Sequence, residues 1–163
     1  MKAATEKDLR ASFVNCSKGE AKRLTIPKGL NEQPWDNLDF LGWSDPGAPD
    51  RTYLVAERDG EFIGVVMRSA AASAHRPTMC TICLTTHPGS GVCLMTAPKA
   101  GPAGRQGNSV GTYMCSDLAC SLYVRGVKAA PKGGRLAEAL SLPELIERTR
   151  GNVFAFLERV SAA

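Results

Sequence analysis

Two close pairs of cysteines constrain this 163-residue chain more than any other feature of its sequence. Two residues separate Cys80 from Cys83 in "MCTICLTTH", and four residues separate Cys115 from Cys120 in "YMCSDLACSLYVRG". A Cys-x2-Cys step lets two thiolates reach one ion from a tight turn, and zinc takes thiolates at tetrahedral structural sites. We therefore predict that these four cysteines hold one zinc ion.

Disulfides, a redox pair and plain core packing are the alternatives. The opening "MKAATEKDLRASF" is too charged for a secretory leader, and no apolar run approaches the roughly 18 residues of a membrane span, so we expect a cytoplasmic protein, where disulfides are rare. A thioredoxin-like role for Cys80 and Cys83 lacks its βαβ context. We expect Cys16 and Cys93 to be small core residues, and His87 to be a surface or hydrogen-bonded histidine rather than an alternative ligand.

The segments around the cysteines predict a treble-clef order. Two strands, "GVCLMTA" and "VGTYM", are joined by the Gly/Pro-rich loop "PKAGPAGRQGNS", and a short helix is expected from Asp117 to Val124. That helix would place Cys115 just before its start and Cys120 one turn or more inside it. This order is treble-clef architecture: a turn with the first cysteine pair (the knuckle), then a hairpin, then a helix whose start carries the last ligands. Four thiolates leave no open coordination position, so the ion would be structural.

The N-terminal part predicts short helices and one irregular stretch. Helices are expected over 5–13 and 18–24, each with a capping residue at its start. The segment 26–50 contains four prolines and is expected to be long and irregular, pinned by its aromatic and leucine side chains. The small residues of "SAAASAHRP" predict a flexible link over 69–77.

The clearest local signals are a hairpin and a long helix. "TYLVAERDGEFIGVVMR" predicts two strands with Asp59 and Gly60 as a two-residue turn, which sets Leu54 opposite Val65. Apolar residues at spacings of three and four, after a capping box, predict an amphipathic helix over 141–161. The expected class is α+β: antiparallel hairpins, a treble-clef zinc finger and a C-terminal amphipathic helix.

Positive charge is concentrated around the cysteine pairs. Between Phe62 and Ala137 the chain has eight basic residues and one acidic residue, a net charge of +7, whereas the rest of the chain is −3. This asymmetry indicates an acidic partner, either RNA phosphate or an acidic protein face, against the alternative of an ordinary solvated surface. The basic residues are Arg68, Arg76, Lys99, Arg105, Arg125, Lys128, Lys132 and Arg135.

Motifs that resemble catalytic or phosphate-binding loops do not fit their required context. "GNSVG" matches the nucleophile-elbow pattern, but a loop precedes Ser109, a strand follows it, and both histidines lie upstream. "GRQG" resembles the clamping loop of KH domains without its flanking helices, so a hairpin tip is expected there. We assign no catalytic residue and expect neither enzyme activity nor a small-molecule substrate.

The segments "MCTICLTTH", "GNSVGTYMCSDLACSLYVRG" and "RASFVNCSKGEAKRL" together resemble the bacterial elongation factor G-binding proteins with a C-terminal treble-clef zinc finger, which are related to fusidic acid resistance proteins. The resemblance covers nearly the whole chain. It implies zinc ligands at Cys80, Cys83, Cys115 and Cys120, contact with the translocation GTPase elongation factor G, and release of that factor from the ribosome. Larger members carry an N-terminal helical bundle, so we expect this chain to be a short form without it.

We expect one elongation factor G-binding domain over 1–163, with the treble-clef subdomain at 78–126 and the C-terminal helix at 141–161. Basic and aromatic groups near the finger are the expected partner contacts, because Arg and Tyr combine contact area with directional bonds. A non-enzymatic adaptor for elongation factor G is the first hypothesis, a ribosome- or RNA-binding module is the second, and no membrane partner is expected. The expected contacts are Lys99, Arg105, Tyr113, Tyr123 and Arg125.

Overall fold

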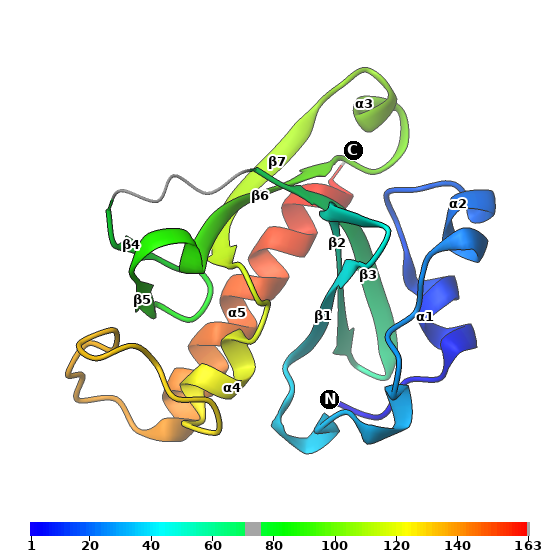
Figure 1. The fold of residues 1–163 in the computed structure, drawn as a ribbon. Helices are drawn as coiled ribbons and strands as arrows, with labels where there is room; N and C mark the ends of the chain where they lie inside the picture. Colours follow the sequence, from blue (N-terminus) through cyan, green and yellow to red (C-terminus); the bar gives the residue numbers. More distant parts are fainter. Residues whose placement is uncertain (71–75, 163) are drawn as a thin grey trace.

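The computed structural model describes residues 1–70 and 76–162, so most of the link expected over 69–77 lies outside the described residues. Its centre is a five-stranded antiparallel sheet with the order β1-β2-β3-β6-β7. Two hairpins therefore lie side by side and meet between β3 and β6 (Figure 1). The strands are β1 (Phe40–Asp45), β2 (Ala48–Arg58), β3 (Glu61–Ser69), β6 (Val92–Pro98) and β7 (Ser109–Cys115).

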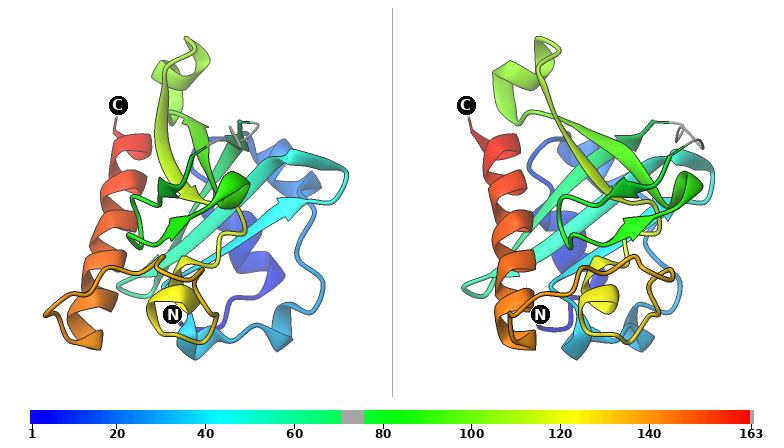
Figure 2. Two further views of the ribbon diagram at one scale, coloured as in Figure 1. Left: turned by 60° about the vertical axis from the view of Figure 1, so that its left-hand side comes forward. Right: turned by 90° about the vertical axis from the view of Figure 1, so that its left-hand side faces the viewer.

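Helices cover both faces of this sheet, and a small two-stranded knuckle stands beside it (Figure 2). The expected α+β class is thus confirmed. Among the described residues, no helix is long and apolar enough to cross a lipid bilayer. The remaining elements are α1 (Glu6–Ser12), α2 (Lys18–Arg23), the 3-10 turns η1 (Leu30–Glu32), η2 (Trp35–Asn37) and η3 (Gly89–Gly91), the knuckle strands β4 (Thr78–Met79) and β5 (Thr86–His87), and α3 (Gly101–Arg105), α4 (Cys120–Val124) and α5 (Leu142–Ser161).

The first hairpin has the register that its sequence predicts. Leu54 lies opposite Val65, and the turn residues Asp59 and Gly60 have φ values of 53° and 85°, the left-handed conformation of a primed turn. Alternate side chains therefore point to opposite faces. One face, which includes Leu54, packs on the α5 side, whereas the other, which includes Val55, packs on the α1 side.

One strand was not expected. Residues 40–45 form the edge strand β1 instead of part of an irregular segment, and β2 begins at Ala48, before the expected start of the hairpin. A bulge between Ser44 and Asp45 ends the regular pairing of β1 with β2. Pro46 therefore lies in the turn, and Pro49 lies at the start of β2, where neither residue has to donate an N–H group to a neighbouring strand. The burial of β1 does not alternate cleanly along the strand, which is why periodicity missed it.

Helix α5 closes one side of the core (Figure 1). Its start has the expected capping box, in which Ser141 and Glu144 bond reciprocally. Its apolar stripe packs against the sheet, with Val153, Phe156 and Leu157 each 1% exposed. Burial of side chains of this size contributes roughly 2 kcal/mol each, so this helix is held by packing rather than by helix propensity.

A buried ion pair fixes α4 to β1. Arg125 donates to both carboxylate oxygens of Asp39, at 2.6 and 2.9 Å, and the two side chains are only 13% and 4% exposed. The Asp39 amide also donates to the hydroxyl of Ser121 in α4, at 3.0 Å. The first hairpin is thereby fastened to the part of the chain that follows the second cysteine pair.

Removing one partner of this pair should strongly destabilise the fold. Asp39→Ala leaves the Arg125 guanidinium buried without its counter-charge, and we expect the free energy of unfolding to fall by about 3 kcal/mol. Urea denaturation followed by circular dichroism measures this change. Asp50→Ala is the matched control, because it breaks the exposed pair with Arg68 and should cost less than about 1 kcal/mol. Equal costs for the two variants would contradict the role given to Asp39.

Candidate metal centre

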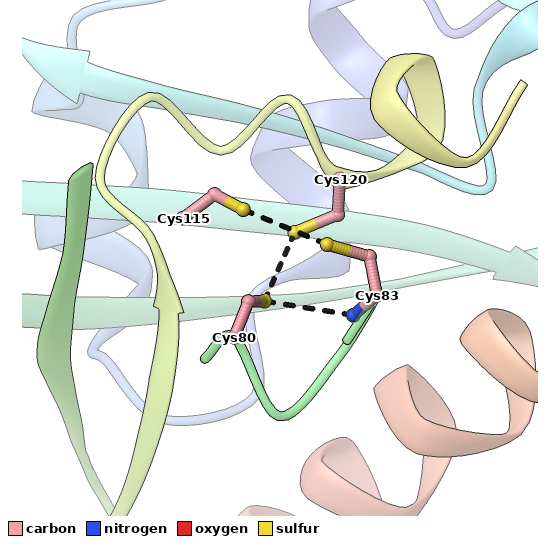
Figure 3. A group of neighbouring side chains, drawn as sticks. All are labelled: Cys80, Cys83, Cys115 and Cys120. Atoms are coloured by element: carbon pink, nitrogen blue, oxygen red, sulfur yellow. Dashed lines mark hydrogen bonds between the residues drawn. The ribbon is translucent and has the colours of Figure 1, made fainter. Parts of the chain in front are cut away.

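Four cysteine side chains from three separate segments meet at one buried point (Figure 3). Cys80 and Cys83 lie on the turn between β4 and β5, Cys115 ends β7, and Cys120 is the first residue of α4. Their sulfur atoms all lie within 4.8 Å of one another. The structure therefore brings together both cysteine pairs that the sequence singles out.

The sulfur spacing suits a tetrahedral ion. The Sγ atoms of Cys80 and Cys120 lie 3.6 Å apart, as do those of Cys83 and Cys115. Zinc–sulfur bonds of about 2.3 Å in a tetrahedron require sulfur–sulfur separations of about 3.8 Å. A disulfide has a sulfur–sulfur bond of about 2.05 Å, and all six cysteines of the chain are free. The donor set thus fits a thiolate-bound metal and excludes disulfide pairing in this structure.

The knuckle sequence folds so that backbone N–H groups face a sulfur. The amides of Ile82 and Cys83 point at the Sγ of Cys80, at 3.4 and 3.5 Å. The turn is closed by Leu84, which takes the left-handed φ of 57° and donates its amide to the Cys80 carbonyl at 3.0 Å. Such N–H groups stabilise thiolate charge in a water-poor site.

The four-residue spacing of the second pair is accommodated by a turn rather than by a helix. The helix α4 begins at Cys120, so the expectation that it begins at Asp117 and carries Cys120 inside it is wrong. Leu118 has a φ of 57°, a left-handed conformation that interrupts any helix started before it. A Cβ on Gly42 of β1 would lie 2.6 Å from the Leu118 Cβ, so only glycine lets the turn pack this closely on the sheet.

The thiols perturb one another strongly. Burial first, and then the neighbouring sulfurs, raise the pKa of the Cys120 thiol well above its usual range. Hydrogen bonds from Cys115 and Cys120 hold the pKa of the Cys83 thiol far below it. Four adjacent thiolates repel one another unless a cation lies between them, so a divalent ion is the natural charge partner of this cluster.

His87 lies beside the cluster rather than in it. Its Nε2 is 3.4 Å from the Sγ of Cys115, its ring packs edge-on against Tyr123 with centroids 4.8 Å apart, and it is 5% exposed. A Cβ on Gly91 would fall 2.5 Å from the His87 Cβ, so this glycine makes room for the imidazole. The interpretation of His87 as a hydrogen-bonded histidine is consistent with this position.

Two of the five expected partner contacts have internal partners instead. Tyr123 is 8% exposed, its hydroxyl donates to Asp117 at 2.6 Å, and burial together with that bond raises the pKa of the phenol. Arg125 is held by Asp39, as described above. Both side chains are thus engaged within the protein, and their role as partner contacts stays a prediction. Asp39 could not be found from the sequence, since it lies 86 positions from its partner.

The other three expected contacts reach the surface. Lys99 is half-buried and Arg105 is exposed, both at the tip of the β6–β7 hairpin, and Tyr113 on β7 is 49% exposed. Their role stays a prediction. Cys93 is 5% exposed in the core, as expected, whereas Cys16 is only half-buried and packs against a small cluster of buried side chains.

Loss of one clustered sulfur should remove both metal and stability. We expect Cys83→Ser to lose the bound ion and to unfold the treble-clef part at ordinary temperature, because structural zinc supplies about 10–16 kcal/mol in small fingers. Elemental analysis of the purified protein and thermal unfolding measure the two effects. Cys16→Ser, outside the cluster, should keep both ion and stability. A stable, fully loaded Cys83→Ser protein would contradict this assignment.

The contact between the His87 Nε2 and the Cys115 sulfur should tune metal retention. His87→Phe keeps an aromatic ring against Tyr123 but removes Nε2, so we expect the protein to fold and to lose metal roughly 10- to 100-fold more readily to a competing chelator. Chelator titration against wild-type protein gives this ratio. Unchanged retention would mean that the imidazole only fills space.

Comparison with known proteins gives the same architecture. The family model for the FBP C-terminal treble-clef zinc-finger matches residues 8–160. Among solved structures, that of the fusidic acid resistance protein FusC matches with a TM-score of 0.59 at 15% identity, over 99% of this chain. This chain spans 60% of the FusC chain, and at this identity the likeness shows the fold alone. No curated protein gives a significant match.

The family match covers nearly the whole chain and contains all four clustered cysteines. It thereby confirms the resemblance to treble-clef zinc-finger proteins that the segments around the cysteines indicated. This chain belongs to the FBP C-terminal treble-clef zinc-finger family.

Proposed function

We propose that this chain is a non-enzymatic zinc protein that binds elongation factor G and promotes its release from the ribosome. The observation that carries the proposal is the family match over residues 8–160 around a buried four-cysteine cluster. The fold likeness to FusC, a fusidic acid resistance protein, supports it. We further propose that residues 1–163 act as one factor-binding domain, in which 78–126 is the zinc-finger subdomain.

The zinc ion would be held by Cys80, Cys83, Cys115 and Cys120. When bound, it supplies a structural cross-link and no open position for chemistry, because all four positions are filled by sulfur. The residues themselves set the surface that the partner would meet. The knuckle is tied to β7 by Thr81, whose amide and hydroxyl donate to the Tyr113 carbonyl at 2.9 and 2.8 Å.

One face of β7 offers an aromatic anchor. Ser109, Gly111 and Tyr113 alternate with inward-facing residues, so all three point outward on one side of the strand. Met79 on the knuckle is 40% exposed, and it precedes Cys80 directly. Tyrosine and methionine are both enriched at protein interfaces. We propose Tyr113 as the central contact and Met79 as a contact that the sequence pattern did not single out.

The hairpin tip adds positive charge on a rigid base. Lys99 and Arg105 make no ion pair within the described part of the chain. The tip is anchored because the Ala100 amide donates to the Val160 carbonyl at the end of α5, at 2.8 Å. Gly104 is required there, since a Cβ would lie 1.8 Å from the Lys99 carbonyl oxygen. A fixed cationic tip steers an acidic partner and makes binding depend on salt.

Charge reversal at the tip should weaken factor binding without unfolding the protein. We expect Arg105→Glu to raise the Kd for purified elongation factor G about tenfold at low salt, and less at high salt, because screening removes the steering. Fluorescence anisotropy with ribosome-free factor measures this change. Lys28→Glu, an exposed charge reversal in the N-terminal layer, is the matched control and should leave the Kd unchanged.

RNA is the competing partner, and the same preparation tests it. Retention of elongation factor G after nuclease treatment and without ribosomes supports the proposal. Retention of ribosomes alone, abolished by nuclease, would overturn it in favour of an RNA-binding module. Release is tested separately by the dissociation of labelled factor from ribosomes, which the wild-type protein should accelerate and Arg105→Glu should not.

A further inference from the structure

Helices α1 and α2 lie on the opposite side of the sheet from α5 (Figure 1). The cysteine cluster shares the core on the α5 side, whereas residues of α1, α2 and their connection line a groove on the other side. Its volume is about 760 Å³. Its wall is mostly apolar, with basic side chains at several points. The residues that line it are Glu6, Lys7, Arg10, Ala11, Phe13, Cys16, Lys18, Ala21 and Lys22.

The floor of this α1/α2 groove is rigid. Phe13 packs edge-on against Trp43 and Tyr53, with ring centroids 6.3 and 6.0 Å apart. Next to it, the Val14 amide donates to the Gly64 carbonyl of β3 at 3.0 Å. The connection between the two helices is therefore fixed to the sheet, and the apolar surface is present before any ligand arrives.

Arg10 ties the two walls of the groove together. Its Nη1 donates to the carbonyl oxygens of Ala21, Lys22 and Leu24, at 3.0, 2.8 and 3.0 Å. Its remaining nitrogens bind Glu6, at 2.7 and 2.8 Å. The acidic side chain on the groove is thus neutralised internally. The groove keeps its width because one guanidinium joins the first helix to the end of the second.

The lysines of the groove are left without acidic partners. Lys7, Lys18 and Lys22 are exposed and form no ion pair within the described residues. Lys18 and Lys22 stand one turn apart on the same side of α2, whereas Lys7 faces them from α1. Three separate positive points around an apolar floor are complementary to several carboxylates flanking an apolar stripe, not to one small anion.

We propose that the α1/α2 groove binds an acidic amphipathic segment of a protein partner. Apolar side chains on one face of the segment would pack on Ala11, Phe13 and Ala21, and carboxylates beside that stripe would pair with the lysines. This is a second interaction surface. It lies on the other face of the sheet from the cysteine cluster and uses none of the residues proposed to contact elongation factor G.

A designed peptide tests the groove with the full-length, metal-loaded protein. The probe is a fluorescein-labelled helix of leucine, alanine and glutamate, with leucines at positions i, i+3, i+4 and i+7 and glutamates on both flanks of that stripe. Fluorescence anisotropy should show saturable binding that weakens with salt. A peptide of the same composition in scrambled order, and one with lysine in place of glutamate, should bind at least tenfold more weakly.

Variants locate the binding. Lys18→Glu with Lys22→Glu should weaken peptide binding about tenfold, and Lys18→Gln with Lys22→Gln should weaken it less, because the first pair reverses charges that the second only removes. Ala11→Trp fills the groove without changing charge and should also weaken binding. Lys132→Glu, an exposed charge reversal beyond the finger, should have no effect. Circular dichroism confirms that each variant is folded.

The outcomes are separable from those of the proposed function. Equal binding of the ordered and scrambled peptides would overturn the groove proposal. So would a loss of peptide affinity in Lys132→Glu as large as that in the Lys18→Glu, Lys22→Glu variant. Binding of laurate at the groove, detected by its sensitivity to Ala11→Trp, without peptide binding would replace the peptide by a small anionic lipid and would likewise overturn it. Neither result bears on elongation factor G, whose binding should be unaffected by the Ala11→Trp and Lys18/Lys22 variants.

Discussion

The convergence of four sulfur atoms is the constraint on which the rest of the structure depends. It joins the knuckle, the end of β7 and the start of α4. The helix α4 then connects the cluster to the first hairpin, because Arg125 at its end forms an ion pair with Asp39, directly before β1. An ion in the cluster would thus order the second hairpin directly and the first hairpin through one buried ion pair.

The sheet separates two kinds of surface. On one side, α5 and the cysteine cluster share a single core, and the exposed groups near it are a rigid cationic tip and an outward-facing tyrosine. On the other side, two short capped helices enclose an apolar groove whose lysines form no ion pair with any described residue. Both surfaces combine apolar area with positive charge. The groove and the cysteine cluster lie on different faces of the sheet, whereas the hairpin tip reaches the connection between α1 and α2, where the Asn15 side chain donates to the Pro98 carbonyl at 2.9 Å.

Counting charges along the chain gave an incomplete account of the charged surface. The stretch 62–137 is strongly basic in sequence, yet Arg68, Arg125 and Lys128 each pair with an acidic residue. Free positive charge remains at the hairpin tip. It also collects at the groove, in a part of the chain that was not expected to be basic. Folding decides which charged side chains are paired, because an ion pair needs two groups close in space. Partners such as Asp39 and Arg125 are far apart in sequence, so the sequence alone does not show that they pair.

The sequence by itself determined what local chemistry dictates. The Asp-Gly turn set the register of the first hairpin, capping boxes set the starts of three helices, and the cysteine spacing predicted one shared cluster. Only the tertiary structure decided that residues 40–45 form the strand β1 and that α4 begins at Cys120. It also decided that Tyr123 and Arg125 bond to Asp117 and Asp39, and that a groove lies between α1 and α2. These features depend on contacts between distant segments, such as Gly42 beneath Leu118, and no short stretch of sequence records such contacts.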